Sequence, residues 1–537
     1  MKNKPGFRLA MTWLHNWTGI VLGTLLFTIW WTGTLSVFDK EIDMWMQPET
    51  RIPVADQHLD VDQVISQIQD VRPDRQIESF RLYLPETRVP FFSVHADLAH
   101  DDEGHEHQTE QDHGHESIDA RLNPQSGDTL GDQQSRAASR FFYPMHYTLL
   151  SGAAGYIIVA LATLFMMVLL VTGVVIHRKI FADFFTFRPK KKLRRSSLDL
   201  HNIAGTIFLP FHFLICLSGL AIFAGFYAGL PLRFVQLVDP ANQTVKLYHQ
   251  ASDYGVYRRD AAGTPGEMAP IEPMVQRAEQ IWTVRYEQSA EADRIDAYHY
   301  GDANAVIQVR RNFPSNRTDS RRDTVFFDGV TGEVLADFQA SSVQKARAWL
   351  EGFHQIRFDH WPIRWLYFAA GLSGCVLIGT GFVFWTASRT KKADTRQPVK
   401  IRLVEAMSVG SVTGIIVATG MYFIVNRLLA TDIIKADSNW AEIEMRCFFY
   451  GWMLTFIHAF VRKQRAWADQ CGLITVLAVT AVLFNWYTTG TNYLHDIQQG
   501  LWMVAGMDMA LLVSAIVAAL VCFQLRRPTR LAAYRKE

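Results

Sequence analysis

The stretch SLDLHNIAGTIFLPFHFLICLSGLAIF, residues 197–223, is apolar enough to cross a membrane and yet carries His201 and His212. These residues are 11 positions apart (212 − 201), which on a helix places them within about 20° of each other and roughly 16 Å apart along the axis. Ionisable side chains inside a membrane span are costly and are candidates for function by default. This stretch therefore points both to the fold class and to the residues that carry function.

The chain has 537 residues, of which 49% are hydrophobic, and the apolar residues gather into long runs. A bilayer requires a run of about 20 residues, and eight runs are candidates. They are 14–38, 147–176, 200–229, 363–387, 404–426, 442–461, 471–489 and 500–524. The sequence thus predicts a polytopic α-helical membrane protein with about eight transmembrane helices.

The basic residues predict the orientation of these helices. Loops 178–199, 388–403 and 462–470 are rich in Lys and Arg, as are both termini. Because basic loops remain in the cytoplasm, both termini are expected there, and the long loops 39–146 and 230–362 are expected to be exoplasmic. The net charge of +1 gives no sign of nucleic-acid binding, since the basic residues follow the topology.

Two constant offsets reveal an internal duplication. His15 matches His201 (201 − 15 = 186), and His146 matches His354 (354 − 146 = 208). The second offset also carries the pair Thr172–Gly173 onto Thr380–Gly381. Each external loop holds a helical stretch followed by alternating strands, and the loops end alike in "LNPQSGDTLGD" and "FFDGVTGEVLAD". Two copies running in the same direction imply a pseudo-twofold axis along the membrane normal.

The expected organisation follows from these boundaries. Residues 1–38 hold the first span, 39–146 the first small α+β external domain, 147–229 the second and third spans, 230–362 the second external domain, 363–390 the fourth span, and 391–537 a separate appendage of four further spans.

The paired histidines predict haem. Neutral imidazole is a common metal ligand and readily takes an axial position on haem iron. The pairs His15/His201 and His146/His354 would hold two b-type haems, one in each leaflet. No CxxCH motif is present, so the haems would be held without covalent links.

Two further histidines break the repeat, because the counterparts of His177 and His212 are Trp385 and Leu26. They offer an alternative pairing, His177 with His201 on the inside and His212 with His146 on the outside. Asp508, inside the last span, is a further candidate for a proton or quinone site.

A polar insertion lies at 95–116 in the first external domain, with six histidines, eight carboxylates and no Lys or Arg. The histidines are His95, His100, His105, His107, His113 and His115. The insertion is either a solvated loop or a loose binding site for divalent metal ions.

The paired LHN helices, the GEVL ending and the segment TGVVIHRKIFADFFTFRPKKKLRRSSLDLHN resemble the PepSY-associated transmembrane family over about 1–390. That family includes bacterial inner-membrane ferric-siderophore reductases and iron-uptake proteins. The resemblance implies a haem-binding inner-membrane protein with two periplasmic PepSY-like domains.

The expected function is a b-type haem oxidoreductase that moves electrons from a cytoplasmic donor or the quinol pool to a periplasmic ferric siderophore or other iron chelate. The alternative is a non-redox PepSY membrane protein that regulates a peptidase or assists metal uptake.

Overall fold

A computed structural model describes the chain at residues 6–54, 59–99, 117–131, 135–177, 187–189, 193–223, 238, 257–312, 323–356, 358, 360–389, 399–431 and 439–527. The chain forms two compact units. The first comprises Met1–Arg51, Gln133–Leu220 and Trp361–Glu537, and the second comprises Ile52–Asp132 and Ala221–His360.

The first unit is built from long apolar helices. Among the described residues, six helical segments are long and apolar enough to cross a membrane, and a bent pair adds a seventh if it is one span. The single-helix segments are α1 (Phe7–Ser36), α5 (Gly152–Ile176), α12 (Trp361–Arg389) and α18 (Trp502–Arg526). Large apolar side chains such as Ile157, Leu161 and Leu520 are exposed on these helices, as a lipid-facing surface requires. The protein is therefore a multi-pass membrane protein.

The apolar stretch 197–223 is not one straight helix. It forms α6 (Leu193–Ile207) and α7 (Leu209–Ile222), which meet at an angle of 63°. Pro210 explains the bend, because proline lacks a backbone N–H and its ring clashes with the preceding turn. The duplicated position in α1 is Thr24 (210 − 186), and α1 runs unbroken through it.

The segment Trp440–Thr489 is long and apolar enough to cross a membrane, yet it is a hairpin of two helices. These helices are α15 (Trp440–Arg462) and α16 (Ala466–Thr489), joined by the 3₁₀ turn η3 (Lys463–Arg465). Gln470 Nε2 donates to the Thr455 carbonyl oxygen at 3.0 Å. A continuous helix would separate residues 15 positions apart by roughly 22 Å, so the chain reverses at η3.

The remaining C-terminal helices pack on the duplicated part of the first unit. Helices α13 (Val399–Val409) and α14 (Ile415–Leu429) flank a π-helical turn, η2 (Gly410–Gly414). Ser411 Oγ lies 2.8 Å from Thr24 Oγ1, and Trp31 Nε1 donates to Thr419 Oγ1 at 3.1 Å. The C-terminal helices thus pack in the same unit as α1, tied to it by these polar contacts and by a shared aromatic core.

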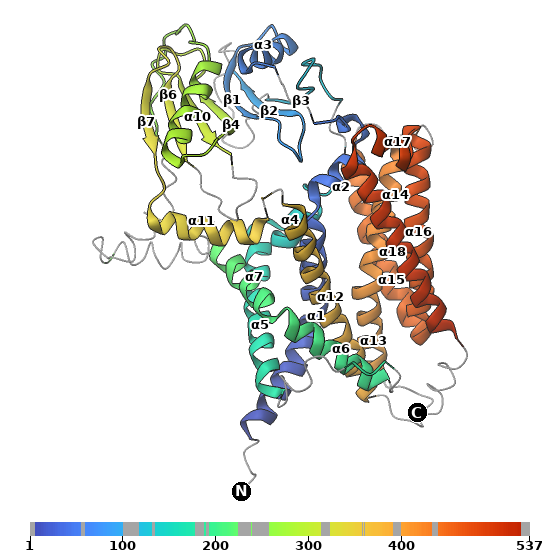
Figure 1. Ribbon diagram of the computed structural model, residues 1–537. Coiled ribbons are helices and arrows are strands. Elements are labelled where there is room, and N and C mark those ends of the chain that lie inside the picture. Colours follow the sequence, from blue (N-terminus) through green and yellow to red (C-terminus); the bar gives the residue numbers. More distant parts are fainter. Residues whose placement is uncertain are drawn as a thin grey trace, which may run out of the picture. The chain divides into compact units, whose positions relative to one another are not determined.

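Helices α14, α15, α16 and α18 run side by side, as Figure 1 shows. Three short elements complete the first unit near the ends of its long helices. They are α2 (Asp39–Met46) with the 3₁₀ turn η1 (Pro48–Thr50), α4 (Phe142–Thr148), and α17 (Tyr493–Gln498).

The second unit contains one seven-stranded antiparallel sheet rather than two separate ones. Its strand order is β3-β2-β1-β4-β5-β6-β7. The first copy supplies β1 (Ile77–Tyr83), β2 (Phe92–Leu98) and β3 (Ser117–Leu122). The second supplies β4 (Ala292–Tyr298), β5 (Val306–Arg311), β6 (Thr324–Asp328) and β7 (Val334–Phe338). Equivalent strands of the two copies, β1 and β4, pair antiparallel at the centre.

Two helices cover the apolar face of this sheet and cap each other. Helices α3 (Val61–Val71) and α10 (Glu272–Tyr286) pack with the strands in one hydrophobic core. Asp62 of α3 accepts hydrogen bonds from the Ile271 and Glu272 amides, at 2.8 and 3.0 Å. Glu272 of α10 accepts in return from the Val61 amide at 3.3 Å. This exchange satisfies amides that each helix start leaves unpaired, and it follows from the twofold relation of the copies.

Candidate functional site

The six candidate histidines lie on different elements. His15 lies in α1, His146 in α4, His201 in α6, His212 in α7 and His354 in α11 (Ser342–Gln355), and His177 directly follows α5. His354 belongs to the second unit and the other five to the first. The relative positions are therefore defined for the five histidines of the first unit, and the pairing of His146 with His354 stays a prediction.

The structure brings His15 and His201 together. Their ring centres lie 6.3 Å apart and the ring planes are almost perpendicular, at 87°. The two residues come from α1 and α6, which are the matching helices of the duplication. The 186-residue offset (201 − 15) thus corresponds to a spatial pair.

Hydrogen bonds hold both rings by the same nitrogen. His201 Nδ1 lies 2.8 Å from the Leu377 carbonyl oxygen, which only accepts, so Nδ1 carries the proton. His15 Nδ1 lies 3.0 Å from Thr172 Oγ1. The Thr172 hydroxyl also lies 2.8 Å from the Val168 carbonyl oxygen of its own helix. Because its single proton goes to that helix, the Thr172 oxygen accepts from His15. In both rings Nε2 is therefore left as the nitrogen with a lone pair.

Glycines of the duplicated Thr-Gly pairs make room for these rings. A Cβ atom on Gly173 would lie 3.4 Å from His15 Cε1, and one on Gly381 would lie 3.3 Å from His201 Cε1. The Thr-Gly pairs therefore serve close packing, as the sequence suggests, and Thr172 also orients an imidazole. The two copies use the motif differently, since the Thr380 hydroxyl bonds to its own helix, to the carbonyl oxygens of Val376 and Leu377.

His146 is held in the same tautomer at another level of α1. Its Nδ1 lies 2.8 Å from the Ile29 carbonyl oxygen, so Nδ1–H donates and Nε2 carries the lone pair. The ring packs against Gly33, where a Cβ atom would lie only 2.7 Å from it. Gly33 of the TG pair in α1 is therefore required by the ring of His146.

His212 is fully buried and adopts the opposite tautomer. Its Nε2 lies 3.0 Å from Ser373 Oγ and 3.3 Å from the Ala370 carbonyl oxygen, so Nε2 carries the proton. Its Nδ1 is buried and has no hydrogen-bond partner. The ring stands edge-on to Trp30, with the centres 5.2 Å apart. His146 and His212 thus contact adjacent residues of α1, Ile29 and Trp30.

His177 does not contact the inner pair through any recorded bond of its ring. Its backbone N–H donates to the Gly173 carbonyl oxygen at 3.1 Å, and its Nδ1 is buried without a partner. The inner partner of His201 in this structure is therefore His15, the residue that the duplication predicts.

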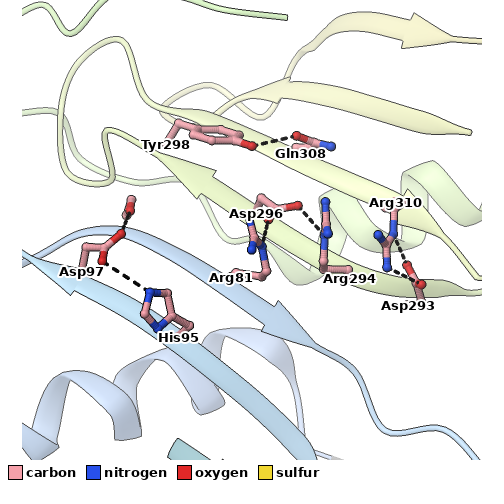
Figure 2. Close-up of polar contacts among 10 residues, drawn as sticks. Arg81, His95, Asp97, Asp293, Arg294, Asp296, Tyr298, Gln308 and Arg310 are labelled. Atoms are coloured by element: carbon pink, nitrogen blue, oxygen red, sulfur yellow. Dashed lines mark hydrogen bonds and ion pairs between the residues drawn. The ribbon is translucent and has the colours of Figure 1, made fainter. Parts of the chain in front are cut away.

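In the second unit, the sheet carries a row of ion pairs that Figure 2 shows in close-up. Asp296 on β4 accepts from Arg81 on β1 and from Arg294 on its own strand, both at 2.7 Å. Arg310 on β5 pairs with Asp293 at 2.6 Å. The Arg81–Asp296 pair joins the two copies across the central strand pair.

The histidine-rich insertion falls almost entirely outside the described residues, and His100, His105, His107, His113 and His115 lie there. His95 lies on β2 between two carboxylates, with Nδ1 3.0 Å from Asp119 and Nε2 3.5 Å from Asp97. Within the described part of the chain, no group of three or more His, Cys, Asp or Glu side chains could hold a metal ion. Metal capture by the insertion stays a prediction.

The candidate Asp508 belongs to a buried polar cluster in the first unit whose other members the sequence did not predict. Asp508 of α18 is fully buried and accepts hydrogen bonds from the indole nitrogens of Trp45 and Trp486, both at 2.7 Å. Arg427 of α14 is also buried, with 1% of its surface exposed. In the sequence, the cluster is marked only by single charged residues in apolar runs. The residues that bond to each other come from four distant segments of the chain.

A comparison with known families identifies the scaffold. The family described as the PepSY-associated TM region matches residues 12–388, from within α1 to the penultimate residue of α12. The chain belongs to this family. An uncharacterised protein of Pseudomonas aeruginosa is 24% identical over 380 residues, which cover 64% of this chain and 87% of that protein. The PepSY-associated match ends near the end of α12, so the C-terminal helices lie beyond it.

Proposed function

We propose that the protein is a transmembrane b-type haem oxidoreductase that delivers electrons to a periplasmic ferric chelate. The observation that supports this most directly is the pairing of His15 with His201 between apolar helices. Both rings are oriented with Nε2 as the lone-pair nitrogen. Two neighbouring imidazoles that keep the same nitrogen as the lone-pair atom are the residue types that would hold a haem through two histidines.

The spacing of the pair fits such a ligand set. Two imidazoles that share one metal ion must lie within a few ångströms of each other. The centres of His15 and His201 are 6.3 Å apart. Gly173 and Gly381 flank the rings where a side chain would crowd them.

A haem bound here would supply reversible one-electron chemistry. The protein residues provide the setting for it. Thr172 and the Leu377 carbonyl hold each imidazole by its Nδ1 proton, which fixes the tautomer and keeps Nε2 available. Gly173 and Gly381 let the helices pack closely against the two rings.

The second haem is proposed at the level of His146. Its Nδ1–H donates to the backbone of α1 as His201 donates to the backbone of α12. The duplication assigns His354 as the partner, and the alternative partner is His212, which contacts α1 one residue away from the His146 contact. Two haems at separate levels would carry electrons across the membrane.

The proposed topology has eight spans. The bent pair α6–α7 forms one span, and the hairpin α15–α16 forms two. Both termini then lie in the cytoplasm, the basic loops face the same side, and the second unit lies in the periplasm of a bacterial inner membrane. The acceptor that suits this placement is a ferric siderophore or other iron chelate, because reduction to Fe(II) weakens oxygen-ligand complexes and releases the metal.

A spectrum of the purified full-length protein tests the proposal. We expect a low-spin Soret band, a reduced α-band and two haems per chain by the pyridine haemochrome method. His15→Ala and His201→Ala should each lower the count to one, whereas His458→Ala should not, because His458 lies outside the duplication and bonds to Gln470. A protein that carries no haem when expressed with excess haem would favour the non-redox alternative, a PepSY membrane protein that regulates a peptidase or assists metal uptake.

A further inference from the structure

The C-terminal helices enclose a cluster of charged side chains that the duplicated scaffold does not explain. Arg427 of α14 and Asp496 of α17 are each 1% exposed, and Asp508 of α18 is fully buried. Arg51, which follows η1, completes the cluster and feels the charges of Asp496 and Asp508. Buried charges are costly unless they are paired or bind something, so each polar atom here requires a partner.

Part of the cluster is fully bonded. Asp508 accepts from Trp45 and Trp486 at 2.7 Å and from Asn485 Nδ2 at 3.2 Å. Arg51 Nη2 donates to Asn485 Oδ1 at 2.7 Å. Asp508 is therefore a satisfied acceptor that anchors Trp45 and, through Asn485, Arg51. It does not itself need a ligand.

Arg427 also bonds through Nε and Nη2, to Asn426 and to the Met46 carbonyl oxygen, but four atoms of the cluster have no partner. Arg51 Nη1, Arg427 Nη1 and both carboxylate oxygens of Asp496 are buried and have no hydrogen-bond partner. Burial lowers the pKa of Arg51 to about 10, so its guanidinium stays charged at neutral pH. Each unsatisfied buried group costs about 1–3 kcal/mol, and more when it is charged. Several such groups in one neighbourhood indicate a molecule that bonds to them.

The unpartnered atoms define the chemistry of that molecule. Two guanidinium groups disfavour a metal cation, and the Asp496 and Asp508 carboxylates disfavour an anion. A neutral ligand remains, with oxygen acceptors for Arg51 and Arg427 and a hydroxyl donor for Asp496. Arg427 lies in the last turn of α14 and Asp508 in the second turn of α18, which are helices long and apolar enough for a membrane, so the proposal takes a lipid-soluble ligand. A quinol or quinone headgroup has these properties.

The cluster is also in packing contact with the helix that carries His146. The Trp45 ring lies 5.6 Å from Phe423, and Phe423 lies 6.3 Å from Phe142 of α4, measured between ring centres. Phe142 is four residues, or about one helical turn, before His146. An electron donor beside Trp45 would thus be connected to the outer histidine through tightly packed aromatic rings.

We propose that Arg51, Arg427 and Asp496 bind the headgroup of a membrane quinol and that this site feeds electrons to the haem at His146. The inference rests on the proposed function and names a donor that enters at the outer haem, so these two electrons do not pass through the haem proposed at His15 and His201. One quinol yields quinone, two electrons and two protons, and the two electrons reduce two ferric chelates to ferrous chelates. The unpartnered carboxylate of Asp496 accepts the first proton from the quinol hydroxyl, and both protons leave to the periplasmic side on the proposed topology.

Binding is tested without reference to haem. The purified full chain in nanodiscs is illuminated with a short-chain azidoquinone, and the labelled peptides are mapped by mass spectrometry. We expect saturable labelling of α17, the start of α18 or α2, suppressed by decylubiquinone or menadione and reduced at least tenfold in Arg51→Gln. Labelling that neither quinone suppresses, or that maps only elsewhere, overturns the proposal and leaves ordered water as the partner of these groups.

Electron transfer is tested by mixing the oxidised protein anaerobically with decylubiquinol or menadiol and following the haem α-band. Asp496→Asn should slow reduction at least tenfold, as loss of a proton acceptor does, while dithionite still reduces all the haem. Asp469→Asn is the matched control, since Asp469 lies on α16 and pairs with Arg462 at 2.8 Å, outside the cluster. Equal rates in wild type and Asp496→Asn overturn the proposal. If Asp496→Asn does not fold, Arg51→Lys takes its place in the same comparison. If the purified protein holds no haem, the proposed function is refuted, but the labelling experiment still decides whether quinone binds at the cluster.

Discussion

The duplication provides an internal control for the hydrogen bond that orients His15. Thr172 accepts from His15 Nδ1 at 3.0 Å, whereas its counterpart Thr380 bonds only to the backbone of its own helix in the recorded contacts. Thr172→Val and Thr380→Val remove the same hydroxyl from equivalent helices and replace it with a methyl group of similar size. Only the first should affect an imidazole.

The magnitude follows from the burial of the bond. A buried donor left without its acceptor costs about 1–3 kcal/mol, and about 1.4 kcal/mol corresponds to a factor of ten in an equilibrium constant. Outer partners of metal-bound histidines are worth about 10–100-fold in affinity. The Leu169 backbone also lies beside His15, as Leu377 lies beside His201, so His15 can turn to this carbonyl. We therefore expect Thr172→Val to weaken haem binding by about tenfold, at the low end of the 10–100-fold range.

The assay is a titration of the haem-depleted protein with haem, followed by the Soret band, together with a redox titration. Thr172→Val should weaken one of two binding phases and leave the other unchanged, and Thr380→Val should leave both unchanged. Equal effects of the two substitutions would show that the hydroxyl acts through helix packing, and no effect of either would refute the role of the hydrogen bond.

Three further predictions concern topology, the insertion and the second unit. Reporter fusions at 110 and 300 should both indicate the periplasm; a cytoplasmic signal at either position contradicts eight spans. Replacing 100–116 by an Asn-Gly turn should leave the haem count intact and reduce binding of divalent metal ions, because β2 and β3 pair up to Asp97↔Ser117 without it; loss of haem would refute this separation. Backbone amides, chiefly that of Ala262, donate to the Asp302 carboxylate and lower its pKa. The stabilisation from these hydrogen bonds is therefore fully present above the ordinary aspartate pKa and is lost as the pH falls through the lowered pKa of Asp302. Hydrogen exchange of the Ala262 amide, corrected for its intrinsic rate, should become faster in that acidic range, and Asp302→Asn should make it faster at neutral pH. An exchange rate that changes in neither experiment contradicts the hydrogen bond from Ala262 to Asp302.

Much of the fold could be read from the sequence because its signals are local or periodic. Apolar runs gave the spans, and alternation with glycine turns gave the helix and strands of each external segment. Fusion of the two segments into one sheet could not be predicted, because it depends on which edge strands meet, and β1 and β4 are more than 200 residues apart. The kink between α6 and α7 had a visible signal in Pro210, which a hydropathy reading ignores.

Of the candidate site too, one part could be predicted from the sequence and another could not. A constant offset predicts that His15 and His201 are related by symmetry, and the structure places them 6.3 Å apart. The charged cluster has no such signal, since Arg51, Arg427, Asp496 and Asp508 are spread over the chain without a motif. Each is a single charge in or beside an apolar run, and only folding shows that they share one neighbourhood.

The tautomers separate the histidines into two kinds. His15, His146 and His201 each use Nδ1 for a hydrogen bond to the scaffold and keep Nε2 as the lone-pair nitrogen. Nε2 projects farther from the main chain than Nδ1, so this choice suits a ligand that must reach a group between helices.

His212 reverses the arrangement, because its Nε2 is used on Ser373 and its Nδ1 lies buried beside its own helix. It would have to turn its ring and break that bond before Nε2 could reach iron. Retention of the outer haem in Ser373→Ala would fit a supporting role for His212, in which it fixes Trp30 and the kinked helix. On the proposed function, haem iron would offset the cost of an imidazole in the membrane at the three residues that hold Nδ1, whereas packing offsets it at His212, which holds Nε2.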